Sequence, residues 1–233
     1  MKNIIIIGAG KGVGVKTAEL LHNNYQLITI SRSLTPELEA LNTNFYQLDV
    51  TKDSLDILSD LPEIIHGVVY CPGSINLKPF NRLTAQDFLN DFQQNVLGAV
   101  AIIQKVLPNL KRANGASVVL FSTVAAKLGM PFHSSIAASK GAIEGLAKSL
   151  AAELAASQVR VNVIAPSLLD TPLAGFLINT DEKKEASGKR HPLQRIGTPN
   201  EIAHLVRFLI GDESSWITGQ IIGADGGLGS LKT

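Results

Sequence analysis

Four glycines, Gly8, Gly10, Gly12 and Gly14, share the short segment GAGKGVG, which lies between an apolar run and a helical pattern. Glycine adopts backbone angles that other residues resist and lets a ligand approach the main chain closely. Backbone N–H groups at the start of a helix also attract phosphate groups. We therefore expect this turn to hold the diphosphate of a dinucleotide. The common pattern G-x-G-x-x-G does not fit, because Val13 occupies its last position, and a plain tight turn is the alternative.

A second group of polar side chains lies in the middle of the chain, around the segment HSSIAASKG. Ser122 and Thr123 follow an apolar run, and their hydroxyls can donate a hydrogen bond to a substrate oxygen. His133 lies seven residues before Lys140, about two helical turns, so both side chains share a face if the helix extends that far. An imidazole with a pKa of about 6.5 is a competent proton donor. The alternative is that His133 caps the helix or faces solvent.

Strand and helix patterns alternate along the chain and must position these residues. Short apolar runs predict the strands Ile4–Ile7, Tyr25–Ser31, Phe45–Leu48, Ile64–Tyr70, Ala116–Ser122, Val159–Ile164 and Ile221–Gly223. Longer periodic stretches predict the helices Val13–His22 and Ser134–Ala156, and a third that Thr84 and Asp87 cap and that runs towards Pro108.

This alternation predicts an α/β fold, a Rossmann-type doubly wound parallel sheet of about seven strands with helices on both faces. We expect one domain over residues 1–233, with ligands at the carboxyl ends of the strands, where the strand order reverses. The segment 167–197 is the least regular and contains a charge cluster, Asp181–Glu185. We expect it to be a lid over the site, and the alternative is a short solvated helix with flexible flanks.

The composition excludes several classes of partner. Because 21 basic residues balance 20 acidic ones and no basic stripe is present, we expect no nucleic acid partner. The only cysteine, Cys71, cannot form an internal disulfide, and the scattered histidines lack ligand spacing, so we expect no metal. The first apolar run is too short for a signal peptide, and none approaches the roughly 18 residues of a membrane span. We expect a cytoplasmic protein.

The chain resembles the short-chain dehydrogenase/reductase family over its whole length. The family turn T-G-x-x-x-G-x-G matches Ile7–Gly14 at every glycine, with an isoleucine in place of the threonine. The segment VRVNVIAP, which ends at Pro166, and the segments RIGTPNEIA and SSWITGQIIGADGG also match family patterns. Two departures are clear: only Gly73 remains of the family's Asn-Ala-Gly, and Ser167 replaces a usual glycine.

The resemblance implies a site for a nicotinamide dinucleotide. It places Asp49 and Val50 near the adenine, Thr171 near the carboxamide, and Lys140 on the nicotinamide ribose. A site that prefers NAD has an acidic residue after the second strand, but the segment here reads Ser-Arg-Ser. The resemblance instead places Arg32 and Lys11 around a 2′-phosphate, which a guanidinium binds through charge-assisted hydrogen bonds.

We therefore expect NADP(H) as the preferred cofactor, with NAD(H) as the second option. The alternative is that these two cations are ordinary solvated charges and that the site does not discriminate.

The resemblance also implies a catalytic set with one member missing. Thr123, thirteen residues before Ile136, takes the position of the serine that holds the substrate oxygen. Asn95, in NVLG, matches the asparagine that orders a water beside Lys140. Ile136 stands where the family has the tyrosine that donates the proton, a group worth about 10²–10⁴ in rate. His133 is the best substitute, and its spacing is similar to that of the tyrosine in the enoyl reductase branch.

Other routes are a water relay from Ser134 or Ser135 and a substrate that needs no strong acid.

Two functions follow from these observations. The first is an NADP(H)-dependent oxidoreductase acting on a carbonyl or alcohol of a small molecule. The second is a catalytically inactive NADP(H)-binding sensor or scaffold, which Ile136 favours. In the family the long helix that carries Lys140 commonly packs between subunits. The resemblance therefore implies a homo-oligomer, a dimer or a tetramer, in which the small-residue stripe Ala137, Gly141 and Gly145 is a packing face.

Overall fold

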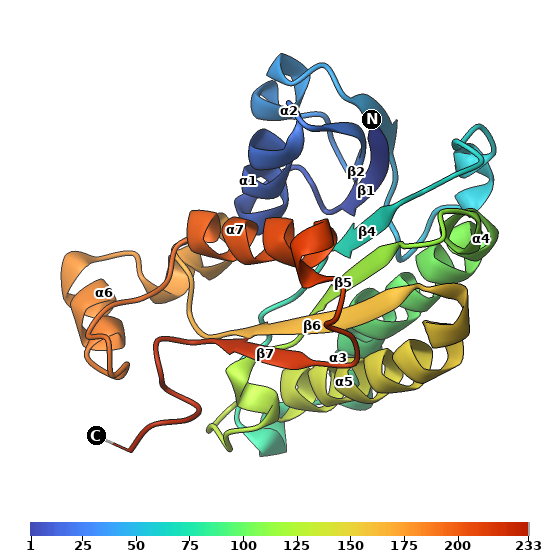
Figure 1. Ribbon diagram of the computed structural model, residues 1–233. Coiled ribbons are helices and arrows are strands. Elements are labelled where there is room, and N and C mark those ends of the chain that lie inside the picture. The colour runs from blue at the N-terminus through green and yellow to red at the C-terminus, as the bar shows by residue number, and fades with distance from the viewer. Residues whose placement is uncertain (233) are drawn as a thin grey trace.

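One parallel β-sheet forms the centre of the computed structural model, which describes residues 1–232 (Figure 1). Within this range seven strands pair in the order β3-β2-β1-β4-β5-β6-β7, and every pairing is parallel. The order reverses between β1 and β4, which confirms the predicted doubly wound sheet. The strands are β1 Lys2–Ile7, β2 Tyr25–Ser31, β3 Asn44–Gln47, β4 Gly67–Tyr70, β5 Ser117–Phe121, β6 Arg160–Pro166 and β7 Ile221–Ala224.

Helices cover both faces of the sheet (Figure 1). One face carries α1 Gly12–Leu21, α2 Pro36–Ala40 and α7 Pro199–Ile210, and the other carries α3 Ala85–Phe92, α4 Gly98–Arg112 and α5 Ser134–Leu154. The helix α6, Asp181–Gly188, projects from the rest of the molecule beyond the carboxyl ends of β6 and β7. The segment 167–197 therefore lies at the edge of the sheet where ligands are expected.

The first strand shows why the opening apolar run is continuous. Ile4 and Ile6 pack against α1 and α7, whereas Ile5 and Ile7 pack against the α4 and α5 side. Each of these four side chains is at most 1% exposed. Burying an isoleucine contributes about 1.5–3 kcal/mol, so a strand covered on both faces needs apolar residues at every position. This rigid strand delivers the glycine-rich turn to the sheet edge.

The helix expected after Thr84 is correct at its start and wrong at its end. Thr84 and Asp87 form the predicted capping box, with the Thr84 N–H donating to Asp87 Oδ2 at 2.9 Å. The helical path passes through a π-helical turn, Gln93–Leu97, and then through Pro108, and it ends at Arg112. Packing of α4 on the sheet outweighs the hydrogen bond that a proline inside a helix removes.

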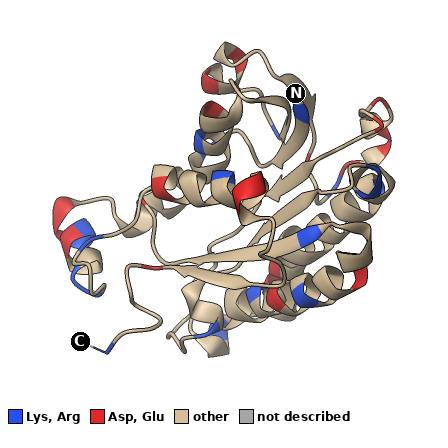
Figure 2. Cartoon of the chain, viewed as in Figure 1, with Lys and Arg blue, Asp and Glu red and all other residues tan. Residues whose placement is uncertain are grey.

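Charged residues are spread over both helical layers, and acidic and basic residues stand side by side on α6 (Figure 2). Within residues 1–232 no helix combines the length and the apolar character that crossing a membrane requires. In the same range no three histidine, cysteine, aspartate or glutamate side chains gather closely enough to hold a metal ion.

Candidate functional site

Two adjoining cavities lie at the carboxyl ends of the strands. The first, of about 630 Å³, extends from the glycine-rich turn past the ends of β2 and β4. The second, of about 590 Å³, lies between the end of β5, the start of α5 and the segment 167–197. The cavities adjoin each other and share wall residues, namely Val13, Cys71, Gly73, Leu169, Thr171 and Leu173. A long ligand in the first cavity can therefore present one end to a small molecule in the second.

The glycine-rich turn forms the floor of the first cavity, and its geometry requires glycine. Gly8 and Gly12 have φ angles of 76° and 57°, in the left-handed region. A Cβ atom on Gly14 would lie 2.2 Å from the carbonyl oxygen of Gly8, which is too close for any side chain. In the described residues α1 has no side-chain cap at Lys11, so the first N–H groups of α1 remain available to a ligand. This arrangement suits a phosphate group.

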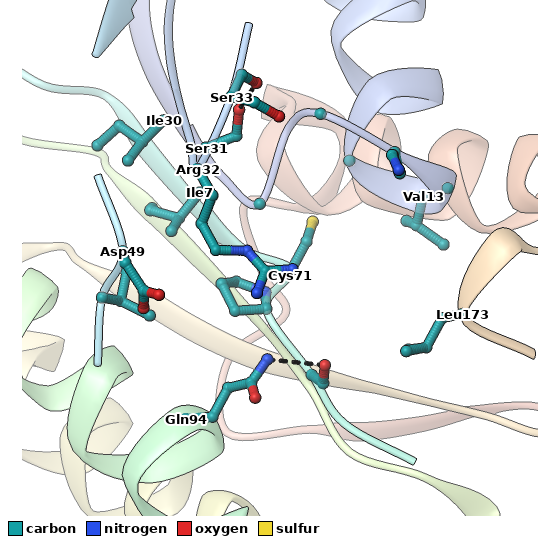
Figure 3. Close-up of a pocket in the computed structure, with 18 of the residues that line it drawn as sticks. Ile7, Val13, Ile30, Ser31, Arg32, Ser33, Asp49, Cys71, Gln94 and Leu173 are labelled. Carbon is teal, nitrogen blue, oxygen red and sulfur yellow. Dashed lines mark hydrogen bonds between the residues drawn. The ribbon is translucent and has the colours of Figure 1, made fainter. Parts of the chain in front are cut away.

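Charged residues mark the far end of the first cavity (Figure 3). Arg32 follows β2 and extends into the cavity, and Asp49 stands beyond the end of β3. The hydroxyl and the backbone N–H of Thr51 donate to Asp49 Oδ1 at 2.7 and 3.0 Å. These bonds lower the pKa of Asp49, and the charges of Lys52 and Arg32 lower it further. The cavity therefore holds cations where a site for an unphosphorylated ribose would place a carboxylate.

The positions of the predicted cofactor residues are as follows. The first cavity is lined by Gly8, Gly10, Lys11, Gly12, Val13, Gly14, Arg32, Asp49, Val50, Gly73 and Thr171, and the second by Lys140 and Pro166. All of them thus line one of two adjoining cavities.

Lys140 is the charged group at the junction of the cavities. It is 7% exposed, and its Nζ donates to the carbonyl oxygen of Phe121 at 2.9 Å. Burial lowers its pKa to about 8, while the carboxylate of Asp91 acts in the opposite direction. Burial likewise raises the pKa of the Cys71 thiol to about 12, so this thiol stays protonated at neutral pH.

Asn95 lies behind Lys140, and in the described part of the chain its side-chain oxygen has no hydrogen-bond partner. Its Nδ2 donates to the carbonyl oxygen of Asp91 at 2.7 Å, and its Oδ1 is buried. A Cβ atom on Gly73 would lie 3.7 Å from both Asn95 Oδ1 and Lys140 Nζ. An unpaired buried acceptor costs about 1–3 kcal/mol, so this oxygen marks a place for a hydrogen-bond donor beside the lysine.

A buried carboxylate beside this pair was not predicted from the sequence. Asp91 is 3% exposed and accepts hydrogen bonds from the hydroxyls of Ser74 and Ser135, each at 2.5 Å. It lies one helical turn before Asn95, and its charge acts on Lys140. The spacing of four between Asp91 and Asn95 was the only signal in the sequence, because both serines come from distant segments.

The two candidate hydroxyls differ in their availability. The Ser122 hydroxyl donates to Glu144 Oε1 at 2.6 Å, on α5, and lies near the carbonyl oxygen of Lys140. Thr123 Oγ1 accepts from the N–H of Ala125 at 3.3 Å, which leaves its own proton free for a ligand. Both residues line the second cavity, but the hydrogen bonding favours Thr123 over Ser122 as the group that holds a substrate oxygen.

Ile136 and His133 also line the second cavity. Ile136 is 6% exposed and lies one helical turn before Lys140, so the wall of the cavity at this point is an apolar side chain. The helix does not extend to His133, because α5 begins at Ser134, as predicted, and His133 occupies the cap position. His133 Nδ1 lies 2.6 Å from the carbonyl oxygen of Pro131 and must carry a proton to bond it. Nε2 is the nitrogen left for a ligand.

The segment 167–197 contains a 3₁₀ turn, Pro172–Leu177, and α6, and it forms one wall of the second cavity. A histidine that the sequence left unassigned anchors this wall. His191 is 2% exposed; its Nε2 lies 2.8 Å from the hydroxyl of Ser167, and its Nδ1 lies 2.9 Å from the carbonyl oxygen of Ser187. This histidine ties α6 to the end of β6, a contact that no local spacing reveals.

Comparison with known proteins gives consistent matches along the chain. A family model described as "Enoyl-(Acyl carrier protein) reductase" matches residues 8–229. A tropinone reductase homolog of Arabidopsis thaliana is 32% identical over 241 residues, which cover 97% of this chain and 92% of the relative. The 3-oxoacyl-[acyl-carrier-protein] reductase FabG of Thermotoga maritima is 32% identical over 246 residues, with 97% of both chains covered.

Solved structures match equally well. The ligand-free aldohexose dehydrogenase of Thermoplasma acidophilum superposes with a TM-score of 0.88 at 29% identity, covering 100% of this chain and 96% of that one. A tyrosine-to-phenylalanine variant of ElxO with NADPH bound superposes with a TM-score of 0.90 at 27% identity, covering 99% of each chain. ElxO with NADP bound gives a TM-score of 0.89 at the same identity and coverage.

Proposed function

This chain belongs to the short-chain dehydrogenase/reductase family of oxidoreductases, and from that premise we propose that it is an NADP(H)-dependent enzyme acting on a carbonyl or alcohol of a small molecule. The observation that carries the proposal is that the two cavities adjoin each other, with the glycine-rich turn in one and Lys140 in the other, beside the shared wall residue Gly73. A dinucleotide and a small substrate can meet there.

The residues of the first cavity fit a phosphorylated dinucleotide. The glycine-rich turn would hold the diphosphate, since a side chain at Gly14 would fill the space that the backbone needs. Asp49 and Val50 would contact the adenine. Arg32 and Lys11 would bind the 2′-phosphate, and the absence of an acidic residue directly after β2 supports NADP(H) over NAD(H). When bound, the nicotinamide supplies or accepts the hydride.

The residues at the junction would position the reacting end. Lys140, Thr171 and Pro166 would hold the nicotinamide and its ribose, and Thr123 would donate a hydrogen bond to the substrate oxygen. Asn95, whose Oδ1 is buried and free in the described chain, would accept a hydrogen bond from a water beside Lys140. The segment 167–197 would act as a lid that excludes bulk water from this junction.

The proton for the substrate oxygen would come from His133. Its Nδ1–H is engaged by the carbonyl of Pro131, so Nε2 is the atom that would give the proton to the oxygen. Donation therefore requires the imidazolium form, in which both nitrogens carry protons. The histidine that remains is neutral and keeps its bond to Pro131. In the oxidation direction the neutral Nε2 would take the proton from the alcohol.

A second function has specific support. Ile136 has no proton to donate, so the chain could bind NADP(H) without turnover, as a sensor of redox state or a scaffold. The structure of an ElxO variant in which a tyrosine is replaced by phenylalanine holds NADPH, so that protein binds its cofactor with one phenol removed. This hypothesis predicts tight binding of NADPH and no consumption with any substrate.

One experiment separates the two functions. Purified protein is mixed with NADPH and a panel of aldehydes, ketones and enones, and the loss of NADPH absorbance is followed. We expect consumption with at least one compound, and a His133→Ala variant should lower kcat by about 10²-fold or more. The control is His204→Ala, on the exposed face of α7. NADPH binding without consumption supports the sensor, and an unchanged kcat in His133→Ala removes His133 from the mechanism.

We also propose that the protein is a homo-oligomer that uses the exposed face of α5. Nothing in residues 1–232 comes within 4 Å of the positions where Cβ atoms of Gly141 and Gly145 would lie, so a second helix could approach this backbone closely. Size-exclusion chromatography with light scattering should give at least twice the 24.8 kDa mass of one chain. A mass of one chain at micromolar concentration would contradict the proposal.

A further inference from the structure

Four cations on α6 and directly after it fall into two groups. Lys184 and Lys189 do not line the second cavity and form ion pairs, Lys184 with Asp170 at 2.5 Å and Lys189 with Glu185 at 2.6 Å. Lys183 and Arg190 line the second cavity instead. Within residues 1–232 neither has a carboxylate within 4.0 Å.

The two cations outside the cavity thus have acidic partners, Asp170 before the helix and Glu185 on it, and the two that line the cavity have none within the described residues. The only hydrogen bond of the Lys183 ammonium to a described side chain goes to the neutral amide oxygen of Asn179, at 2.9 Å. Figure 2 shows that acidic residues are available on α6 itself.

The rest of the second cavity has the same electrostatic character. Its described lining includes no aspartate or glutamate, and its basic side chains are His133, Lys140, Lys183 and Arg190. Most of the remaining wall is hydrocarbon, for example Ile75, Leu77, Met130, Leu177 and Leu228. A ligand complementary to this space has an apolar body and a negatively charged end.

The position of Arg190 is fixed by its neighbour. His191 is held on both sides, by Ser167 at the end of β6 and by Ser187 on α6, and it is almost completely buried. The backbone at position 190 is therefore attached to the sheet edge and does not belong to a freely moving loop. An arginine placed in this way can form paired, charge-assisted hydrogen bonds with a carboxylate or a phosphate.

We propose that the substrate of this protein is an apolar small molecule that carries a carboxylate or a phosphate, bound by Arg190 and Lys183 on the cavity side of α6. This inference rests on the proposed function, because it places the reacting carbonyl or alcohol of the same molecule at Thr123 and His133.

The test compares three ligands with the same eight-carbon chain: octanoate, octyl phosphate and the neutral octanamide. Isothermal titration calorimetry is run on the full chain with and without saturating NADP⁺. We expect at least one anion to bind about 10-fold or more tightly than octanamide, as one well-placed charge-assisted contact provides. The stronger of the two anions identifies the group as a carboxylate or a phosphate.

Matched variants locate the effect. A Lys183→Gln/Arg190→Gln double variant should reduce the preference for the anion to less than about 3-fold, whereas a Lys184→Gln/Lys189→Gln variant removes the same charge and should keep it. Equal binding of all three ligands, or no binding of either anion at millimolar concentration, overturns the inference. An equal loss in both double variants also overturns it, because the preference would then reflect overall charge.

Failure of this inference can be distinguished from failure of the proposed function. NADPH binding is titrated independently in the wild type and in both double variants, and it should be unchanged in all three. If the wild type does not bind NADPH, the proposed function is contradicted. The titrations without nucleotide then still decide whether the second cavity selects anions. Intact NADPH binding without any preference for an anion rejects only the substrate class.

Discussion

Replacing Ile136 with tyrosine is the perturbation that tests the site chemistry most sharply. Ile136 lines the second cavity one helical turn before Lys140, whose burial holds its pKa at about 8. A phenol at this position would lie beside an ammonium group that favours its ionised form and lowers its pKa. A positioned general acid accelerates a reaction by about 10²–10⁴, which corresponds to about 3–5 kcal/mol of activation free energy.

The assay measures NADPH consumption with the same panel of carbonyl compounds in a His133→Ala background, so that only one proton donor is varied. Ile136→Phe is the control, because it adds the same ring without the hydroxyl. Overpacking can cost about 1–3 kcal/mol, and thermal unfolding must show that both variants fold. We expect Ile136→Tyr to exceed Ile136→Phe in kcat by about 10² or more. Equal rates in two folded variants that bind NADPH would refute the reasoning.

Three further predictions concern stability. Because burial lowers the pKa of Lys140 from 10.5 to about 8, the unfolded chain binds more protons between these values. The cost of burial, on the order of 3 kcal/mol, is therefore fully present below pH 8 and is relieved as the pH rises towards 10.5. Urea denaturation should show this rise in the wild type and not in Lys140→Met; parallel pH profiles would contradict it. Gly14→Ala would place a Cβ atom 2.2 Å from Gly8 O. It should lower the free energy of unfolding by about 3 kcal/mol or more and abolish NADPH binding, and a wild-type melting temperature would contradict this. His191→Ala should lower the free energy of unfolding by about 2–4 kcal/mol and speed amide hydrogen exchange in α6, because Ser167 and the carbonyl of Ser187 lose their shared partner; unchanged exchange would show that His191 does not anchor α6.

Local signals account for the parts of the fold that the sequence predicts well. A continuous isoleucine run can be stable only as a strand covered on both faces, so β1 and the turn after it follow directly. Thr84 and Asp87 satisfy each other's backbone groups within one helical turn, and this capping box sets the start of α3. The path through Pro108 could not be predicted, because packing of α4 on the sheet decides it.

Contacts between distant segments account for the parts of the site that the sequence did not predict. Asp91 is satisfied by Ser135, 44 residues away, and His191 by Ser167, 24 residues away. In neither pair does the sequence separation indicate a contact, because each contact depends on how the strands and helices pack. Ser122 likewise could not be distinguished from Thr123 by sequence alone. Its hydroxyl already donates to Glu144 on α5, whereas the Thr123 hydroxyl proton is not engaged in this way.

The central claim is that the first cavity binds NADPH through the glycine-rich turn and Arg32. Calorimetric titration of the wild type and of Arg32→Ala with NADPH and with NADH tests it most directly. We predict that the wild type binds NADPH about 10-fold or more tightly than NADH and that Arg32→Ala loses this preference while still binding NADH. If the wild type binds neither coenzyme at millimolar concentration, the claim is contradicted, and the roles proposed for the cofactor and catalytic residues are lost with it.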